Sequence, residues 1–178
     1  MGLLGLPMIR RDNLPLSAKE AGTVMYVAMR TAEFLLRDAQ VLYRSGSWVR
    51  AAGLGVLALE EIGKIRLIMN IVNAGTDAVA LKQAWKNYRS HPAKSSQTLT
   101  PGVFSDEAAR LEEQYGYGLD FDRLKQLAFY SNQLEDGSWV IPEQVVTQDH
   151  SSFVLSLASI MVRQALESYQ KDQAGELQ

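Results

Sequence analysis

The sequence of 178 residues has no cysteine and only two histidines, His91 and His150. The absence of cysteine excludes disulfide bonds and thiolate metal ligands. Acid–base chemistry by an imidazole is limited to these two residues, and we expect neither a bound metal ion nor another cofactor. The choice of catalytic groups is therefore small.

Long apolar runs are also missing, and no uncharged apolar stretch reaches the 18 residues typical of a membrane-spanning helix. The first nine residues have no basic region ahead of their apolar part, and Leu6 occupies the position where a myristoylation signal has serine or threonine. We therefore expect a cytoplasmic protein without a membrane partner.

The composition, with 47% hydrophobic and 21% charged residues, is typical of one globular domain over residues 1–178. The charge is unevenly distributed, with 13 Lys and Arg against 7 Asp and Glu in residues 1–100, and 5 against 13 in residues 101–178. Such an asymmetry is compatible with a basic face for a polyanion, or with a mixture of charges that evens out on folding.

Hydrophobic periodicity predicts an all-α protein. Ser17 and Glu20 have the form of a helix capping box, and Asp136-Gly137 predicts a tight turn within a small irregular arm near 130–145. The expected helices span residues 18–44, 48–73, 76–90, 105–115 and 147–171, and residues 120–130 are expected to form a short helix or turn. We expect a helical bundle with four to five main helices.

The helix over 48–73 is apolar almost all round, which is typical of the centre of a bundle or of a subunit interface. Its middle nevertheless contains Glu60, Glu61 and Lys64, with Glu60 and Glu61 spaced to pair with the lysine. On a solvent-exposed surface each such pair contributes about 0.2–0.5 kcal/mol to stability, whereas an unpaired buried ion costs several kcal/mol. Glu61 shares its stripe with Leu54, Leu57, Ile65 and Ile68. We therefore expect these charges to be buried and to have a functional or register-setting role.

A second buried acid is expected in the first helix. Asp38 lies on the predicted inward stripe between Leu35 and Leu42. A buried carboxylate needs a partner, so this position predicts a polar contact in the core.

His91 and Lys94 come just after the third predicted helix, because Pro92 disfavours helical geometry in the residue before it. The negative end of the helix dipole attracts protonated side chains there. Lys86 and Arg89 precede them, with Trp85 and Tyr88 nearby, and cations with aromatic rings suit a nucleic-acid backbone and its bases. The alternative for His91 is an ordinary surface residue, as a lone histidine more often is. His150 has no such cations and aromatic rings beside it and is expected to be structural.

Several blocks of this sequence resemble the AbiV branch of the abortive infection proteins. In chain order they are D-A-Q-V-L at 38–42, A-A-G-L-G-V-L-A-L-E-E-I-G-K at 51–64, H-P-A-K at 91–94, R-L-K-Q-L-A-F-Y at 123–130 and D-G-S-W-V-I-P at 136–142. The resemblance implies the HEPN superfamily, whose members are compact helical bundles that usually form dimers. Many of them are metal-independent ribonucleases in phage defence and toxin systems.

Many members of that superfamily carry an arginine followed, after four to six residues, by a histidine, and the sites of two subunits meet at the dimer interface. Counting back from His91 over four residues leads to Lys86 instead of arginine. Lysine can neutralise a phosphate but lacks the bidentate fork of arginine. The chain thus departs from the pattern of the family at this position.

The leading hypothesis is an antiphage homodimer that cleaves RNA, or otherwise arrests translation, in response to a phage-encoded activator protein. In it His91 takes the proton of a ribose 2′-hydroxyl, Lys94, Lys86 or Lys64 stabilises the phosphorane, and Glu61 orients Lys64. Lys86 and Arg89 bind RNA.

The alternative is a non-catalytic interaction module. In that case the E-E-x-G-K helix sets the register of a dimer, and the basic segment binds a phage protein or RNA. Binding of RNA without cleavage would distinguish this module from a nuclease.

Overall fold

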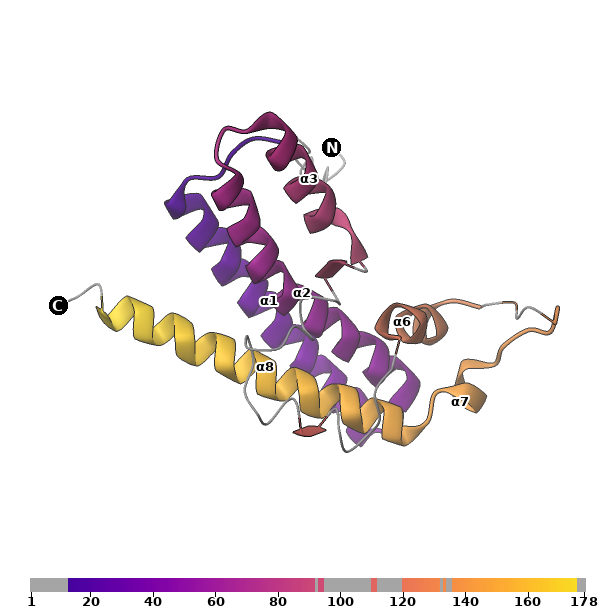
Figure 1. Cartoon of the computed structure of the whole chain (residues 1–178). Helices are drawn as coiled ribbons and strands as arrows, with labels where there is room; N and C mark the ends of the chain where they lie inside the picture. The colour runs from indigo at the N-terminus through magenta and orange to yellow at the C-terminus, as the bar shows by residue number, and fades with distance from the viewer. Residues whose placement is uncertain are drawn as a thin grey trace, which may run out of the picture.

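The computed structural model describes residues 13–91, 93–94, 110–111, 120–131, 133 and 136–175, and these form a helical bundle (Figure 1). Over these residues the all-α prediction is confirmed, since the only β-type pairing among them is one isolated bridge. The elements are α1 (Ala18–Arg44), α2 (Trp48–Ala74), α3 (Ala78–Arg89), α6 (Phe121–Phe129), α7 (Pro142–Val145) and α8 (Gln148–Gly175). Most of the predicted helix at 105–115 lies outside the described residues.

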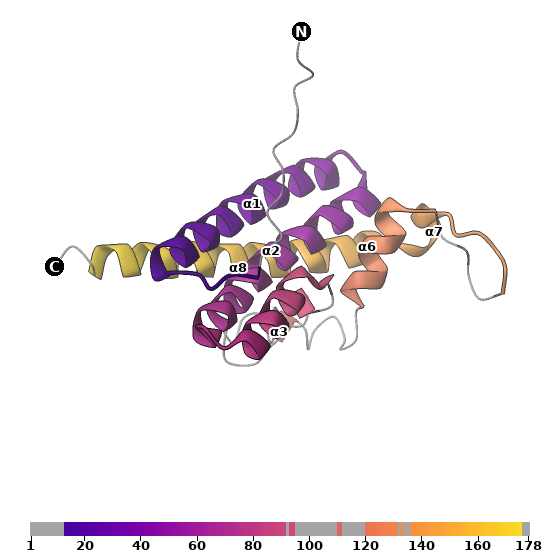
Figure 2. The same ribbon diagram turned by 90° about the horizontal axis from the view of Figure 1, so that it is seen from above.

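Helix α2 is the centre of the bundle. It packs along α1 and also contacts α3, α6 and α8. Figures 1 and 2 show α1 and α2 side by side, with α8 passing across them and α3 and α6 at different ends of α2. A helix with four neighbours needs apolar side chains all round, and this explains the composition of this segment.

Local sequence signals determine the ends of the long helices. Ser17 and Glu20 form the predicted capping box: Ser17 Oγ accepts from the backbone N–H of Glu20, and the Glu20 carboxylate accepts from the backbone N–H of Ser17. Asp77 caps α3 by accepting from the backbone N–H groups of Val79 and Ala80. Gly46, with φ of 82°, allows the tight turn between α1 and α2.

The prediction that Asp38 is partly buried is wrong. Its side chain is 62% exposed, and its nearest cation is Arg37, with 3.8 Å between Nε and Oδ1. The residues of α1 that are buried in this region are Leu36 and Ala39. The inward stripe is therefore displaced from the predicted one, and Asp38 faces solvent.

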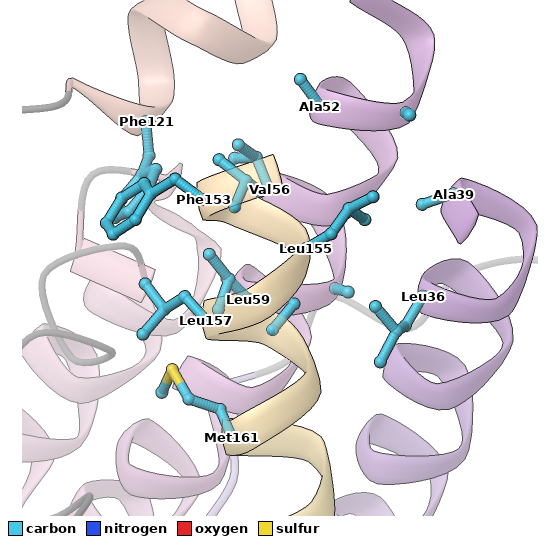
Figure 3. Close-up of a cluster of buried hydrophobic side chains, with 14 of the residues drawn as sticks. Leu36, Ala39, Ala52, Val56, Leu59, Phe121, Phe153, Leu155, Leu157 and Met161 are labelled. Atoms are coloured by element: carbon cyan, nitrogen blue, oxygen red, sulfur yellow. The ribbon is translucent and has the colours of Figure 1, made fainter. Parts of the chain in front are cut away.

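The main core lies between α1, α2, α6 and α8 (Figure 3). Val154, Leu157 and Met161 are fully buried and form the inward stripe of α8. Phe121 of α6 stacks on Phe153 of α8, with ring centroids 6.4 Å apart. The aromatic pair joins the start of α6 to α8.

The irregular arm predicted near 130–145 begins after α6 and ends with α7. Gly137, with φ of 83°, forms its turn, and Gln133 and Trp139 are paired across it by an antiparallel bridge. The described residues of the arm extend away from the bundle (Figures 1 and 2). None of the helices in the described part of the chain combines the length and apolar character needed to cross a bilayer.

Two glycines in α2 allow the neighbouring helices to approach closely. A methyl group on Gly53 would lie 2.8 Å from Cβ of Ala128 and 2.6 Å from the ring of Phe129, both in α6. A methyl group on Gly55 would lie 2.7 Å from Cγ1 of Val154 in α8. Because real Cβ contacts are longer than this, both positions require the absence of a side chain.

We predict that Gly53→Ala lowers the free energy of unfolding by about 1–2 kcal/mol. Overpacking costs about 1–3 kcal/mol, and the helix propensity of alanine offsets only about 0.5–1 kcal/mol of it. The matched control is Gly22→Ala in α1, where an added methyl group meets nothing within 4 Å and should stabilise by about 0.4–1 kcal/mol. Urea unfolding midpoints measure both effects. Stabilisation by both substitutions would contradict the close approach of α6.

Candidate functional site

A buried carboxylate, Glu60, connects three parts of the fold. Its side chain is 4% exposed, and each of its two oxygens has a different partner. Oε1 accepts from Nζ of Lys125 on α6 at 2.5 Å, and Oε2 lies 2.7 Å from Nδ1 of His91, just after α3. These partners are 65 and 31 residues away in the sequence. The site is thus a product of the tertiary fold.

The phase of α2 determines which of the two adjacent acids is buried. Glu60 lies one helical turn after Val56 and one before Gly63, and both of these are buried. The stripe that was expected to be buried contains Leu54, Leu57, Glu61, Ile65 and Ile68. Ile68 is fully buried, whereas the other four are only partly buried. The spacing of Glu60 and Lys64 would also allow a pair within α2, but Glu60 binds residues of other elements.

Glu61 and Lys64 form a separate ion pair beside this carboxylate. Nζ of Lys64 contacts Oε1 of Glu61, and both side chains are about one-fifth exposed. The ammonium group of Lys64 also lies 6.0 Å from the ring centre of Tyr88 in α3. Glu61 thus holds Lys64 close to the ring of Tyr88 in α3.

Lys125 is a member of the site that the sequence analysis missed. Its buried ammonium group contacts Glu60 and also Asp122, one turn earlier, with 2.9 Å between Nζ and Oδ1. Burial alone lowers the pKa of Lys125, but the hydrogen bonds to Glu60 and Asp122 outweigh it and raise the pKa above its ordinary value. Lys125 shares its face of α6 with Phe121 and Ala128, both buried, and this signal could have indicated its burial.

His91 is fixed at one ring nitrogen and open at the other end. A carboxylate accepts hydrogen bonds, so the contact with Glu60 favours the tautomer in which Nδ1 carries the hydrogen and donates it. Nε2 then carries the lone pair. The side chain is 55% exposed, so this nitrogen can meet a ligand from solvent.

Lys94 contributes a cation without a carboxylate partner in the described part of the chain. The residue is 8% exposed, and its backbone N–H donates to the carbonyl of Ser90 at 3.2 Å, which folds the segment after α3 back as a helical turn. Burial, and then the charge of Lys64, lowers the pKa of Lys94, although Glu60 and Glu61 act in the opposite direction. An anion bound here would compensate the positive charge of Lys94 and raise its pKa again.

Lys86 and Arg89 lie outside this charge cluster, on the outer side of α3. Both line a pocket of about 550 Å³ on that side. Arg89 donates to Oδ1 of Asn13 at 2.8 Å, and its guanidinium group lies 5.8 Å from the ring centre of Trp85. The candidate residues thus divide into a charge cluster around Glu60 and a basic pocket on α3.

The other histidine has a local role. Nδ1 of His150 accepts from the backbone N–H of Thr147 at 3.1 Å, at the start of α8. Within the described residues, no group of three His, Asp or Glu side chains is arranged to hold a metal ion.

Comparison with known proteins gives one match. The family model described as AbiV, of the HEPN type, matches residues 20–163, which include every member of the charge cluster. No curated protein and no solved structure matches the chain.

We predict that Glu60→Gln lowers the free energy of unfolding by about 3 kcal/mol, because Lys125 keeps its buried charge and loses its main partner. The double variant Glu60→Gln/Lys125→Met removes both charges and should recover most of that loss. The control, Glu61→Gln, breaks a partly exposed pair and should cost less than about 1 kcal/mol. Equal losses at positions 60 and 61 in urea unfolding would show that Glu60 is not a buried anion.

We also predict a pH-dependent effect of Lys94→Met. The pKa of Lys94 is lower in the folded protein than in the unfolded chain, so protonation opposes folding. At pH 7 the variant should be more stable than the wild type. This advantage should shrink as the pH rises from the folded-state pKa to the ordinary value of 10.5, because the folded wild type then loses its proton first.

The measurement is urea unfolding of both proteins at a series of pH values from 7 to 10. Lys82→Met, at an exposed position of α3, is the control and should show a difference that does not change with pH. A difference in unfolding free energy between Lys94→Met and the wild type that does not change with pH would contradict the lowered pKa of this ammonium group.

Proposed function

The chain belongs to the AbiV family of HEPN proteins, and on this premise we propose that it is an abortive-infection protein that cleaves RNA as a metal-independent endoribonuclease. One observation carries the proposal: the 2.7 Å contact between the buried carboxylate of Glu60 and Nδ1 of His91, whose ring is half-exposed. A carboxylate at one imidazole nitrogen prepares the other nitrogen to accept a proton.

The proposed reaction uses the 2′-hydroxyl of the RNA itself as the nucleophile. Nε2 of His91 accepts the proton of this hydroxyl, and the 2′ oxygen attacks the adjacent phosphorus. The bond from phosphorus to the 5′ oxygen breaks. The products are a 2′,3′-cyclic phosphate and a 5′-hydroxyl end, the latter after the 5′ oxygen takes up a proton.

Lys94 supports the second half of this reaction. Its ammonium group has no carboxylate partner among the described residues and lies beside the Glu60 cluster, so it can neutralise the phosphorane oxygens. The lowered pKa also favours transfer of its proton to the departing 5′ oxygen. Lys64, oriented by Glu61, supplies a second positive charge to the same region.

Glu60 and Lys125 act as positioning residues in this scheme. The ion pair with Lys125 holds the carboxylate in one place on α2, and the carboxylate in turn holds the imidazole. RNA contacts are proposed for Lys86 and Arg89, next to His91 in the sequence.

We further propose that the protein acts in the cytoplasm as a homodimer and responds to a phage-encoded activator protein. An apolar row on the outer face of α1 supports a helix-to-helix interface between two copies. The row consists of Val27, Phe34 and Val41, all exposed and spaced seven residues apart.

A non-catalytic module is the second candidate. It is favoured by Lys86, which lacks the bidentate fork of arginine, and by the contact of Glu60 with Lys125, which would fix α6 to α2 without any chemistry. Such a module would bind RNA or a phage protein and would leave RNA intact.

We predict that the purified protein cleaves total RNA in the presence of EDTA, and that His91→Ala lowers the rate by about 10²–10⁴-fold, the usual contribution of a general base. The matched control is His150→Ala, which removes the other imidazole and should retain activity. Mapping of the product ends should find 2′,3′-cyclic phosphates. Full activity of His91→Ala would exclude it as the base, and intact RNA with the wild type would favour the non-catalytic module.

A further inference from the structure

The basic pocket on the outer face of α3, called the groove below, is separate from the charge cluster around Glu60 and has no assigned ligand. It has a volume of about 550 Å³, and three of its lining residues, Lys82, Lys86 and Arg89, are cations. Among the residues that the structure describes, no carboxylate and no aromatic side chain lines it. A groove of this composition suits the charged backbone of a nucleic acid more than its bases.

The spacing of the three cations follows from the helix. With a rise of 1.5 Å per residue, Lys82 and Lys86 are about 6 Å apart along the axis, and Lys86 and Arg89 about 4.5 Å. Each cation is thus about one helical turn from the next and on the same side of α3. Consecutive phosphates of an extended single strand are separated by a comparable distance, so each side chain can meet one phosphate.

The lining of the groove ends one residue before the candidate catalytic histidine in the chain. Ser90 lines the groove, and the next residue in the chain is His91, which bonds to Glu60. At this end, Arg89 is held by Asn13 at 2.8 Å and lies over Trp85, so its guanidinium group is already oriented before a ligand binds. A strand held along α3 would therefore continue to the imidazole.

We propose that this groove is a subsite for the phosphates of single-stranded RNA on one side of the cleaved bond. The inference rests on the proposed function and specifies the substrate: an RNA strand long enough to span α3, recognised through its backbone and without base preference in this subsite. Lys82 is thereby added to Lys86 and Arg89 as an RNA-binding residue.

Binding to an RNA that cannot be cleaved tests the subsite independently of catalysis. The probe is a fluorescent single-stranded oligonucleotide of ten 2′-O-methyl nucleotides, and anisotropy gives its Kd over a range of salt concentrations. For a single strand, the slope of log K against log salt is about −0.7 per phosphate contact. We expect Lys82→Gln/Lys86→Gln/Arg89→Gln to make this slope less steep by about 2 and to raise Kd at least tenfold.

The matched control is Lys19→Gln/Arg37→Gln/Arg44→Gln on α1, which removes the same charge from exposed positions. It should leave the slope unchanged. The double variant Lys82→Gln/Lys86→Gln keeps the bond between Arg89 and Asn13 and guards against poor folding of the triple variant. It should show about two-thirds of the change in slope that is expected for the triple variant. Equal losses in the α1 and α3 variants would overturn the subsite.

Two further readouts separate the subsite from the proposed function. If the wild type cleaves RNA, the α3 variants should have a higher KM on long RNA than the α1 control variant. If it cleaves nothing but the binding difference remains, the subsite stands and the nuclease fails. Polyglutamate should displace the probe much less readily than unlabelled RNA at equal charge concentration, because its carboxylates do not have the spacing of RNA phosphates. Equal displacement would identify an acidic peptide as the ligand and overturn the choice of RNA.

Discussion

The buried carboxylate of Glu60 is the constraint on which the arrangement of this protein depends. An ion without water must be compensated by other charges or hydrogen bonds, and α2 itself provides neither at this position. Lys125 and His91 supply them from two other parts of the chain. The requirement to satisfy one side chain thus determines where α6 and the end of α3 lie relative to the central helix.

Packing and polar contacts support each other at this junction. Gly53 brings α6 so close to α2 that Ala128 and Phe129 fill the space of a missing side chain, and Lys125 is on the same helix, one turn before Phe129. The stacked rings of Phe121 and Phe153 hold the other end of α6 against α8. The apolar contacts therefore keep the ammonium group within hydrogen-bond distance of the carboxylate, and the ion pair specifies the register.

The sequence was sufficient for the helices, the caps and the family, because these depend on periodicity, local hydrogen bonds and ordered motifs. It also indicated His91, Lys94 and the acidic pair. It could not distinguish Glu60 from Glu61, since a helix that is apolar all round gives no phase to its periodicity. Lys125 was missed because its partner lies 65 residues away, and Asp38 was misassigned because a shift of one residue turns a side chain by about 100° on a helix.

The order of the cluster along the chain has a consequence for biosynthesis. Glu60 emerges from the ribosome first, His91 follows, and Lys125 comes last, 65 residues after the acid it neutralises. Because domains fold as their elements become available, a nascent polypeptide has no complete charge cluster until α6 has left the exit tunnel. A truncated translation product that ends before α6 therefore lacks Lys125 and cannot assemble this centre.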